Sequence, residues 1–555
     1  MNKPLSEHPN PQFYRESYLS LNGEWDYAIS KSEEFPKEYQ GKILVPYSPE
    51  ADLSGVKKVL QPDEWLFYRL KFNLNDFEVL DKVILHFLAV DQIAEVYFND
   101  EYLGKHVGGY LPFSFEIQDY LKDENELIVK VKDFSDTSFY SRGKQKLNHS
   151  GIWYTPNSGI YMPVYIESVN DGYIKDIKIT PDIDKEEVII NVSTSSKYAE
   201  VHIFGSDRPI TPNEDNHIKV KDMHLWSPED PYLYIFKVST DTDEVTSYFA
   251  MRKFSVVKDD KGIPRLGLNN KPYFMKGVLD QGYFPGGLLT PRSYEDYKND
   301  VKLIKDLGFN TVRKHIKIEA PRFYYECDRQ GLIVWQDFIN GGEKYKFSTI
   351  AFPLITGVHH SDHNYKKFAR NSKEGREFAI EEMKGIIHYL YNVPSIGLWT
   401  IFNEGWGQFD AKEVYEKMYE IDSTRIYDHA SGWHDQKVSD TKSLHVYFKR
   451  VKLPKIQQRA IILSEFGGFY YKIEGHMIKG KQVYKGYNSA EDWLKAYETS
   501  INEDVIKNVP FGLSASIYTQ LSDVEEELNG FVTMDREVIK VDPKKIKEIN
   551  DKIKL

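Results

Sequence analysis

Residues 399–405 read WTIFNEG, and residues 461–468 read IILSEFGG. Each stretch is an apolar run that stops at a glutamate, Glu404 or Glu465, with glycine close behind. Such runs are typical of buried strands, and a glycine turn lets the carboxylate point into a cleft instead of packing in the core. Two carboxyl groups delivered in this way suit the cleavage of a glycosidic bond, which needs one carboxylic acid and one carboxylate.

Both stretches belong to a series of alternating strands and helices that begins at Tyr273. The helical segments include residues 294–307, 373–391 and 411–421. Strands are expected at residues 273–277, 311–314, 333–336, 396–402, 426–429, 443–447, 461–465 and 513–518. Eight such units predict a (β/α)8 TIM barrel. Active sites of that fold lie at the carboxyl ends of the strands, and Glu404 and Glu465 end the fourth and the seventh.

Two all-β regions precede the barrel. Up to about residue 168, short alternating strands such as 65–72 and 126–131 are separated by Gly, Asn, Asp and Pro, which predicts a β-sandwich. A second strand series, from 169 to 256, has the length of one immunoglobulin-like sandwich. We therefore predict three domains, at residues 1–168, 169–256 and 257–555.

The composition excludes several classes of function. The 555 residues include 72 Lys and Arg against 84 Asp and Glu. This net charge of −12, without a long basic run, argues against nucleic acid or an anionic membrane surface as the partner. Cys327 is the single cysteine, which excludes an intramolecular disulfide and a multi-cysteine metal site. The first residues lack a signal-peptide core, and no apolar run reaches about 18 residues, so we expect a cytoplasmic protein without a membrane-spanning helix.

A series of motifs, in order along nearly the whole chain, resembles glycoside hydrolase family 2, which includes β-galactosidases, β-glucuronidases and β-mannosidases. The motifs are LNGEW at 21–25, FNDEYLG at 98–104, GGYLPF at 108–113, SGIY at 158–161, WSP at 226–228, GFNTVR at 308–313, NE at 403–404 and SEFG at 464–467. The resemblance implies that the first sandwich is a jelly-roll sugar-binding domain, that the second is immunoglobulin-like and that the barrel is catalytic.

The resemblance also implies a role for each glutamate. Glu404 would be the acid/base and Glu465 the nucleophile of a retaining reaction, with their carboxyl groups about 5–5.5 Å apart. Glu404 would then have to stay protonated near neutral pH, a state that burial and the charge of Glu465 would favour.

Other side chains at the strand ends are expected to bind the sugar. By resemblance, Asn403 hydrogen-bonds the sugar 2-hydroxyl, and Tyr447 lies beside the nucleophile. A turn former and a core tyrosine are the structural alternatives for these two residues. His315, at the end of the second strand, matches the family pattern loosely, and entry into the next helix is its alternative.

Three further candidates close the third, fifth and eighth strands. Asp337 is expected to bind a sugar hydroxyl, and capping of the next helix is its alternative. Trp433 is expected to form a hydrophobic wall. Tyr518 would be a smaller substitute for the tryptophan platform that relatives present after the eighth strand.

The chain departs from the family pattern in two places. Where many relatives carry an Arg-His-Glu-like segment, this chain has Asp280 and Gln281, which are expected to contact the sugar at the −1 subsite. Where glucuronidases present an Asn-x-Lys pair, this chain has three glutamates, at 525–527, which would repel a uronate, so neutral sugars rank first. Arg142 and Lys144 could supply cationic contacts from the first sandwich, but exposed surface positions are the expectation.

No cofactor is predicted. His359, His360 and His363 could suggest a metal site, but no carboxylate spacing supports one, and a loop near the barrel mouth is the expectation. Some relatives use Mg²⁺ or Na⁺, whereas the chemistry itself needs no metal.

The leading hypothesis is an exo-acting retaining β-glycosidase, with β-galactosidase first and β-mannosidase or β-glucuronidase behind it. An endo-acting hydrolase and a non-catalytic carbohydrate-binding protein are the alternatives. The expected partner is an oligosaccharide or glycoside, and the resemblance adds a homo-oligomer assembled through the sandwich domains.

Overall fold

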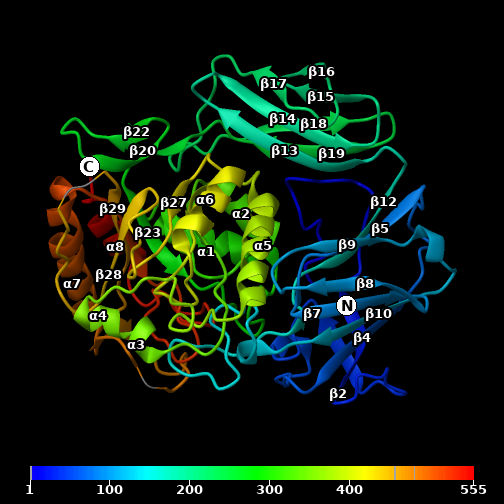
Figure 1. Ribbon diagram of the computed structural model, residues 1–555, viewed down its shortest axis with the longest axis horizontal. Helices are drawn as coiled ribbons and strands as arrows, with labels where there is room; N and C mark the ends of the chain where they lie inside the picture. The colour runs from blue at the N-terminus through cyan, green and yellow to red at the C-terminus, as the bar shows by residue number, and fades with distance from the viewer. Residues whose placement is uncertain (1–2, 456–457, 481) are drawn as a thin grey trace.

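The computed structural model describes residues 3–455, 458–480 and 482–555. Figure 1 shows two β-sandwiches, in blue and teal, that lie against a barrel coloured from green to red. This arrangement confirms the predicted fold class of two sandwiches followed by a TIM barrel. Within the described residues, no helix is long and apolar enough to cross a membrane.

The first sandwich is built from a six-stranded and a four-stranded sheet, with strand orders β3-β2-β4-β10-β7-β8 and β1-β12-β5-β9. Along β7 every second residue is buried, so Ala94, Val96 and Phe98 face the core that also holds Trp25. The strands are β1 (Tyr18–Ser20), β2 (Gly23–Ser30), β3 (Gly41–Val45), β4 (Trp65–Phe72), β5 (Lys82–Phe87), β6 (Val90–Asp91), β7 (Ile93–Phe98), β8 (Glu101–Val107), β9 (Phe113–Glu116), β10 (Asn125–Lys132), β11 (Gly159–Ile160) and β12 (Val164–Val169).

The second sandwich packs a three-stranded sheet, β13-β14-β17, on a four-stranded one, β16-β15-β18-β19. Val188, Ile190 and Val192 alternate along β14 and are completely buried in its core. The strands are β13 (Ile174–Asp182), β14 (Glu187–Thr194), β15 (Ala199–Ile203), β16 (Ser206–Ile210), β17 (Asn216–Lys219), β18 (Tyr234–Ser239) and β19 (Glu244–Phe249).

The barrel consists of eight parallel strands in the order β27-β26-β25-β24-β23-β32-β29-β28. All eight overlap the strands predicted from the sequence. They are β23 (Met275–Asp280), β24 (Thr311–Lys314), β25 (Ile333–Asp337), β26 (Ile396–Thr400), β27 (Ile426–Asp428), β28 (Thr441–Val446), β29 (Ala460–Gly467) and β32 (Leu513–Thr519). The barrel is nearly closed, because β27 and β28, at the two ends of this order, form no ladder pairing within the described residues.

Helices surround the barrel, and a small three-stranded sheet contributes side chains to the core formed by inward-facing residues of the barrel strands. The helices are α1 (Tyr294–Asp306), α2 (Pro321–Gln330), α3 (Phe347–Ile350), α4 (Phe352–Thr356), α5 (Lys373–Leu390), α6 (Ala411–Ile421), α7 (Ala490–Ser500) and α8 (Pro543–Asn550). In the small sheet of β20 (Phe254–Lys258), β21 (Pro264–Leu268) and β22 (Lys271–Pro272), Phe254 and Leu266 join the core of inward-facing residues such as Trp335.

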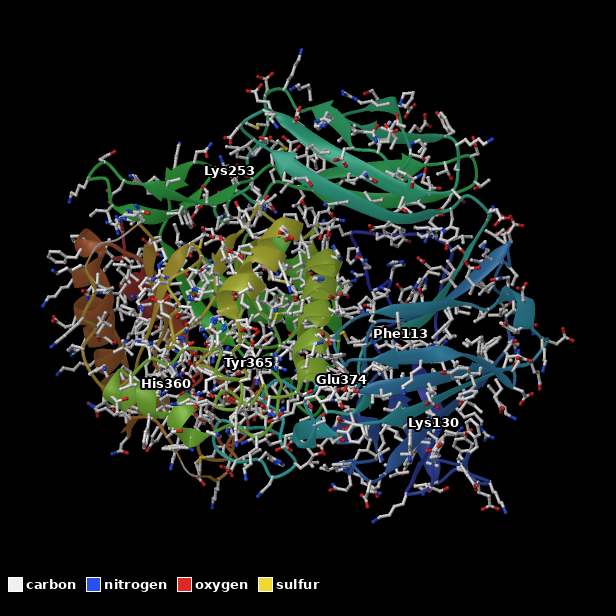
Figure 2. The ribbon with its side chains drawn as sticks, in the orientation of Figure 1. Phe113, Lys130, Lys253, His360, Tyr365 and Glu374 are labelled. Carbon is white, nitrogen blue, oxygen red and sulfur yellow. The ribbon has the colours of Figure 1, made fainter. Side chains whose placement is uncertain are left out.

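The first sandwich contacts the barrel along α5 and the loops near the barrel mouth. Figure 2 shows Glu374, at the start of α5, on the side of the barrel that faces the sandwich carrying Phe113. The neighbouring Gly375 fits closely there, since a Cβ on it would lie 2.9 Å from the Cβ of Phe139. This contact places the loop after β10 beside the carboxyl ends of the barrel strands.

Candidate active site

Glu404 and Glu465 both lie at the carboxyl end of the barrel, as predicted. Glu465 is part of β29, and Glu404 follows β26 in a tight turn. The backbone of Glu404 is left-handed, with φ of 50°, and so is that of Gly405, with φ of 73°. A Cβ on Gly405 would lie 2.6 Å from a ring carbon of His434, so this position requires glycine. The turn turns the Glu404 side chain towards the strand that carries His445.

The two glutamates face one imidazole nitrogen. His445 Nδ1 lies 2.9 Å from Glu404 Oε1 and 3.9 Å from Glu465 Oε2. These two carboxylate oxygens are therefore within about 7 Å of each other, a range that includes the separation of about 5–5.5 Å found in retaining glycosidases. The Tyr447 hydroxyl donates a hydrogen bond to Glu404 Oε1 at 3.3 Å, so this tyrosine joins the pair as expected from its place after β28.

Burial controls the charge of both carboxyl groups. Loss of hydration raises the pKa of Glu404 to about 7; the charges of Lys144 and Arg313 oppose this rise, and that of Glu527 adds to it. Burial, with the charge of Glu404, also raises the pKa of Glu465, against the effects of His445 and Arg313. Glu404 therefore retains its proton close to neutral pH, which is the state that a general acid needs.

Arg313 organises the floor of the site. Its guanidinium is completely buried and donates to both oxygens of Asp337, to Asn403 Oδ1 at 2.8 Å and to the Ser464 carbonyl at 3.0 Å. Its Nη1 lies 3.6 Å from Glu465 Oε2. The sequence indicated Arg313 only as part of a strand motif, because the partners that reveal its role are distant in the chain.

Asn403 and Trp433 flank Glu404. The Oδ1 atom of Asn403 accepts from Arg313, whereas its Nδ2 is buried and has no hydrogen-bond partner in the described part of the chain. That amide is a free donor for a sugar hydroxyl. Trp433 donates its indole N–H to the backbone carbonyl of Glu404 at 2.9 Å and packs edge-on to His445. Trp433 thus anchors the turn at Glu404, and its role as a hydrophobic wall for the sugar stays a prediction.

His315 and Asp337 form a pair beneath this surface. His315 Nδ1 lies 2.8 Å from Asp337 Oδ2, and burial lowers the pKa of His315 to about 3, so its imidazole is neutral. Both Asp337 oxygens are bonded to Arg313 or His315, so Asp337 orients these two side chains and caps no helix. The ring of Trp406 lies 6.2 Å from that of His315, and its indole N–H is buried without a partner in the described residues.

The side chains of the neighbouring residues Asp280 and Gln281 point to different parts of the site. Asp280 is buried in an ion pair with Lys314, at 2.5 Å, and accepts from the backbone of Gly282. Gln281 instead points to Gln520, which donates to Asn529 Oδ1 at 2.7 Å. Gln281 therefore belongs to a polar network on the eighth-strand side of the site, and Asp280 to the support below it.

Tyr518 is not at the mouth of the barrel. Its ring is 1% exposed and packs among Phe466, Trp493, Tyr497 and Phe531, on the α7 side of β32. The prediction of an aromatic platform at this position is wrong, because successive strand residues point to opposite faces and Tyr518 faces the helical layer. The next residues of the chain supply the site instead, through Gln520.

A loop of the first sandwich completes the site, which corrects the expectation of exposed basic residues. Arg142 is 3% exposed and Lys144 7%. Lys144 Nζ donates to the Tyr154 hydroxyl at 3.4 Å, and Tyr154 donates to Glu527 of the barrel. The charge of Lys144 acts on the pKa values of both Glu404 and His315, so its ammonium lies near the candidate acid. The sequence did not reveal this contribution of Lys144, because its partners lie far away along the chain.

The three acidic residues after β32 hold that loop in place. Glu525 accepts from the Thr155 backbone N–H at 2.9 Å, and Glu526 accepts from that of Gly151 at 3.0 Å. Glu527 accepts from Tyr154 and from Asn529. Each carboxylate thus has a donor from a neighbouring segment, and the three together join this segment to the sandwich loop.

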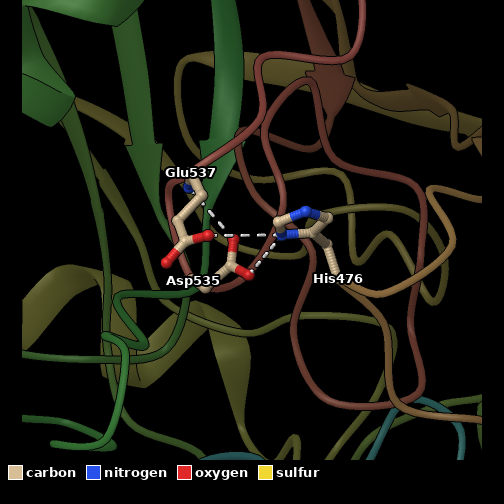
Figure 3. A group of neighbouring side chains, drawn as sticks. All are labelled: His476, Asp535 and Glu537. Atoms are coloured by element: carbon tan, nitrogen blue, oxygen red, sulfur yellow. Dashed lines mark hydrogen bonds and ion pairs between the residues drawn. The ribbon is translucent and has the colours of Figure 1, made fainter.

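The three histidines after α4 do not gather around a metal position. His359 accepts from the backbone of His434, His360 donates its backbone N–H to His434, and His363 pairs with Asp410; Figure 2 shows His360 on this part of the barrel. Across the described residues, metal-ligating side chains converge at His476, Asp535 and Glu537 (Figure 3). There the imidazole already forms an ion pair with Asp535, at 2.8 Å, on a partly exposed surface.

Comparison with known families and structures gives a consistent result. Three models match in succession: "Glycosyl hydrolases family 2, sugar binding domain" at residues 58–156, "Glycosyl hydrolases family 2" at 172–252, and "Glycosyl hydrolases family 2, TIM barrel domain" at 264–554. A β-galactosidase of Thermoanaerobacter pseudethanolicus is 25% identical over 498 residues, which cover 82% of this chain and 62% of that protein. Other curated relatives are covered to a smaller extent, such as 40% or 50% of their length.

Two solved structures share the whole architecture. A β-D-glucuronidase of Dictyoglomus thermophilum superposes with a TM-score of 0.75 at 18% identity, covering 99% of both chains. A galacturonate-bound family 2 β-galacturonidase of Eisenbergiella tayi gives 0.73 at 18% identity, again over 99% of both chains. At this level of identity, the likeness establishes the fold.

Proposed function

The chain belongs to glycoside hydrolase family 2, and from this premise we propose that it is an exo-acting retaining β-glycosidase with Glu404 as acid/base and Glu465 as nucleophile. One observation carries the proposal: the buried Glu465 and the largely buried Glu404, at the ends of the seventh and fourth strands, face the same nitrogen of His445. The raised pKa of Glu404 supports its role as the acid.

The reaction would proceed in two displacements. Glu465 attacks the anomeric carbon while Glu404 gives its proton to the glycosidic oxygen, so the bond to the leaving group breaks as the ester to Glu465 forms. Glu404, now a carboxylate, takes a proton from a water molecule that attacks the same carbon. The ester to Glu465 breaks, and the sugar leaves with its original β configuration.

A terminal β-galactoside is the first substrate we propose. The curated relative named above is a β-galactosidase, and the free donors beside Glu404, Asn403 Nδ2 and the Trp406 indole N–H, suit the hydroxyls of a neutral sugar. A β-mannoside stands behind it. A non-catalytic sugar-binding role is less well supported, because a protein that only binds sugar has no need for a carboxyl group kept protonated beside a second carboxyl.

A β-uronide is the second candidate, and Lys144 is the observation that favours it. This ammonium is nine-tenths buried, has a single long hydrogen bond, to Tyr154, and forms no ion pair with a described carboxylate. A buried cation without a counter-ion is costly, and the carboxylate of a uronic acid would supply one. The structural neighbours named as a glucuronidase and a galacturonidase make this class worth testing.

A panel of p-nitrophenyl β-glycosides tests these proposals. It would contain the galactoside, glucoside, mannoside, glucuronide and galacturonide, assayed with wild type, Glu465→Gln and Lys144→Ala. Lys146→Ala, a lysine of the same loop that stacks on Trp153, is the matched control.

We expect release from one glycoside, with a loss of about 10⁴-fold or more in Glu465→Gln, because no nucleophile remains. Preference for the galactoside with little effect of Lys144→Ala supports the first substrate. Preference for a uronide that Lys144→Ala abolishes and Lys146→Ala preserves supports the second. Full turnover by Glu465→Gln would refute the mechanism.

A further inference from the structure

A continuous line of side chains connects Glu404 to Asp428, a buried aspartate at the end of β27, the strand that pairs with β26. His445 Nδ1 lies 2.9 Å from Glu404 Oε1, and its Nε2 lies 2.9 Å from the Ser431 hydroxyl. The line continues from Ser431 to Ser464 at 2.9 Å, from Ser464 to Ser443 at 2.6 Å, and from Ser443 to Asp428 Oδ2 at 2.7 Å. We call this line the serine relay; its members are Asp428, Ser443, Ser464, Ser431 and His445.

The fold explains why the serine relay is isolated from solvent. Ser443 and His445 alternate along β28 and face inward, Ser464 belongs to β29, and Asp428 and Ser431 lie at the end of β27 and just after it. All five residues are buried. Each hydroxyl needs partners there, since a buried polar group that lacks one is costly. The Ser464 hydroxyl also has the Leu444 carbonyl at 3.3 Å, a longer contact than the 2.6 Å to Ser443.

Counting hydrogens gives the line a direction. A carboxylate only accepts, and each serine has one hydrogen to donate. With Asp428 ionised, Ser443 donates to Asp428, Ser464 to Ser443, and Ser431 to Ser464. The Ser431 oxygen then accepts from His445, so the neutral imidazole carries its hydrogen on Nε2. Its Nδ1 is left as an acceptor that faces Glu404.

Arg313 does not reverse this assignment. Its Nη1 is 3.5 Å from His445 Nε2, the outer limit of a hydrogen bond. Nη1 donates instead to the Ser464 carbonyl, at 3.0 Å, and its contact with Glu465 Oε2, at 3.6 Å, is an ion pair without a hydrogen bond. The charge of Asp428 is among those that raise the pKa of Arg313, so the guanidinium remains charged.

We infer that the serine relay holds Glu404 as a carboxylic acid whose hydrogen points at His445 Nδ1, so that Asp428 and the three serines are positioning residues for the acid. The inference rests on the function proposed above. When Glu404 has given up its proton, the contacts from Glu404 through the serine relay to Asp428 outnumber the hydrogens available. One of these contacts then has no hydrogen to form a hydrogen bond. The relay therefore favours return of a proton to Glu404 in the second displacement.

The electrostatic surroundings agree with this assignment. Burial lowers the pKa of His445 to about 4, so its ring is neutral, and the pKa of Glu404 is raised. Charged and titratable groups surround Glu404: Lys144 of the sandwich loop, Arg313 of β24, His445 and Tyr447 of β28 and its end, Glu465 of β29, Tyr484 between β29 and α7, and Glu527 after β32. A substitution at a serine leaves all these charges in place.

Ser443→Ala is therefore the informative variant, because it interrupts the relay without changing any charge. The pH profile of kcat/KM would be measured with the panel substrate that wild type prefers. We expect the alkaline limb to move to lower pH by about one unit, since one hydrogen bond no longer supports the protonated acid. Ser443→Thr, which keeps the hydroxyl, should restore the limb. Ser514→Ala, at a buried serine of β32 outside the relay, should leave it unchanged. An unmoved limb in Ser443→Ala would overturn the inference.

A second measurement does not depend on activity. Nitrogen NMR of histidine-labelled wild type and of a His445→Gln reference identifies which ring nitrogen of His445 carries the hydrogen. The relay predicts Nε2–H, and Nδ1–H would overturn it. A protein that is silent on every glycoside but shows the Nε2–H form would lose its proposed function while the relay stands.

Discussion

Glu404 illustrates how a single residue acquires its chemistry from several parts of the fold. The left-handed turn at Glu404 and Gly405 directs the carboxyl group, the Trp433 indole fixes its backbone, and burial withholds the water that would ionise it. None of these effects is visible in the residue itself. Together they keep a carboxylic acid protonated at a pH where an exposed glutamate would be ionised.

The pH dependence of turnover follows from the two glutamates. In the proposed mechanism Glu404 must be protonated, and its pKa is raised to about 7, so kcat/KM should be sustained below that value and fall as pH rises through it. Glu465 must be ionised, and its pKa is raised too, so activity should also fall at acid pH, from above the ordinary glutamate value. A kcat/KM profile of the preferred substrate would be bell-shaped. A rate that stays level through neutral and alkaline pH would exclude Glu404 as the acid.

At the scale of elements, the sequence was informative wherever the pattern is local. All eight barrel strands were predicted, because apolar runs and glycine turns mark buried parallel strands within a few residues. The strand ends were informative for Glu404, Glu465 and Tyr447 for the same reason. Tyr518 was misplaced because a strand end places neighbouring residues on opposite faces, and a shift of one residue exchanges them.

Contacts between distant segments could not be read from the sequence. Lys144 and the glutamate at 527 lie in different domains, and each resembles an ordinary surface charge when taken alone. Their meeting through Tyr154 depends on how the sandwich docks on the barrel. Asp337 was predicted as a sugar ligand, but its pairing with Arg313 and His315 becomes apparent only when three strand ends are brought together.

The three glutamates at 525–527 accept hydrogen bonds from residues 151–155 of the sandwich loop, and their hold on this loop can be tested directly. In Glu525→Ala the Thr155 amide loses a charged acceptor, so hydrogen exchange at residues 151–155 should accelerate on the order of tenfold. KM should rise more than kcat falls, because Lys144 and Tyr154 lose their fixed positions. Mass-spectrometric exchange and steady-state kinetics give the two readouts. Glu548→Ala, on the exposed side of α8, is the control. Unchanged hydrogen exchange at Thr155 would show that Glu525 does not hold the loop in place.

For the whole molecule, the segment before β1 links all three domains. Arg15 pairs with Glu167 of the first sandwich at 2.8 Å and with Asp243 of the second at 2.7 Å. Gln12 donates to the carbonyls of Tyr248 and of Asn392, the latter after α5 of the barrel. The candidate active site draws on the first sandwich and the barrel, so a fixed relation between domains is a condition for keeping it intact.

Arg15→Ala should weaken this relation. It leaves Glu167 and Asp243 buried without their shared cation, a change that costs about 3 kcal/mol in comparable buried pairs. We expect a lower midpoint for the first thermal transition, measured by calorimetry. Lys31→Ala, which removes an exposed pair with Asp63, should leave the midpoint unchanged. Equal midpoints for the two variants would mean that the segment does not couple the domains.

Among the described residues, β27 and β28 form no strand ladder, although the Asp440 N–H, directly before β28, donates to the Tyr427 carbonyl of β27 at 3.2 Å. Two links of the serine relay, Ser443 to Asp428 and Ser431 to His445, cross between these two strands. The side chains that hold the proton of Glu404 therefore also hold β27 and β28 together. Heating that separates β27 from β28 would disturb Glu404 while the rest of the barrel stays folded. The proposed catalysis should therefore be lost at a lower temperature than the fold.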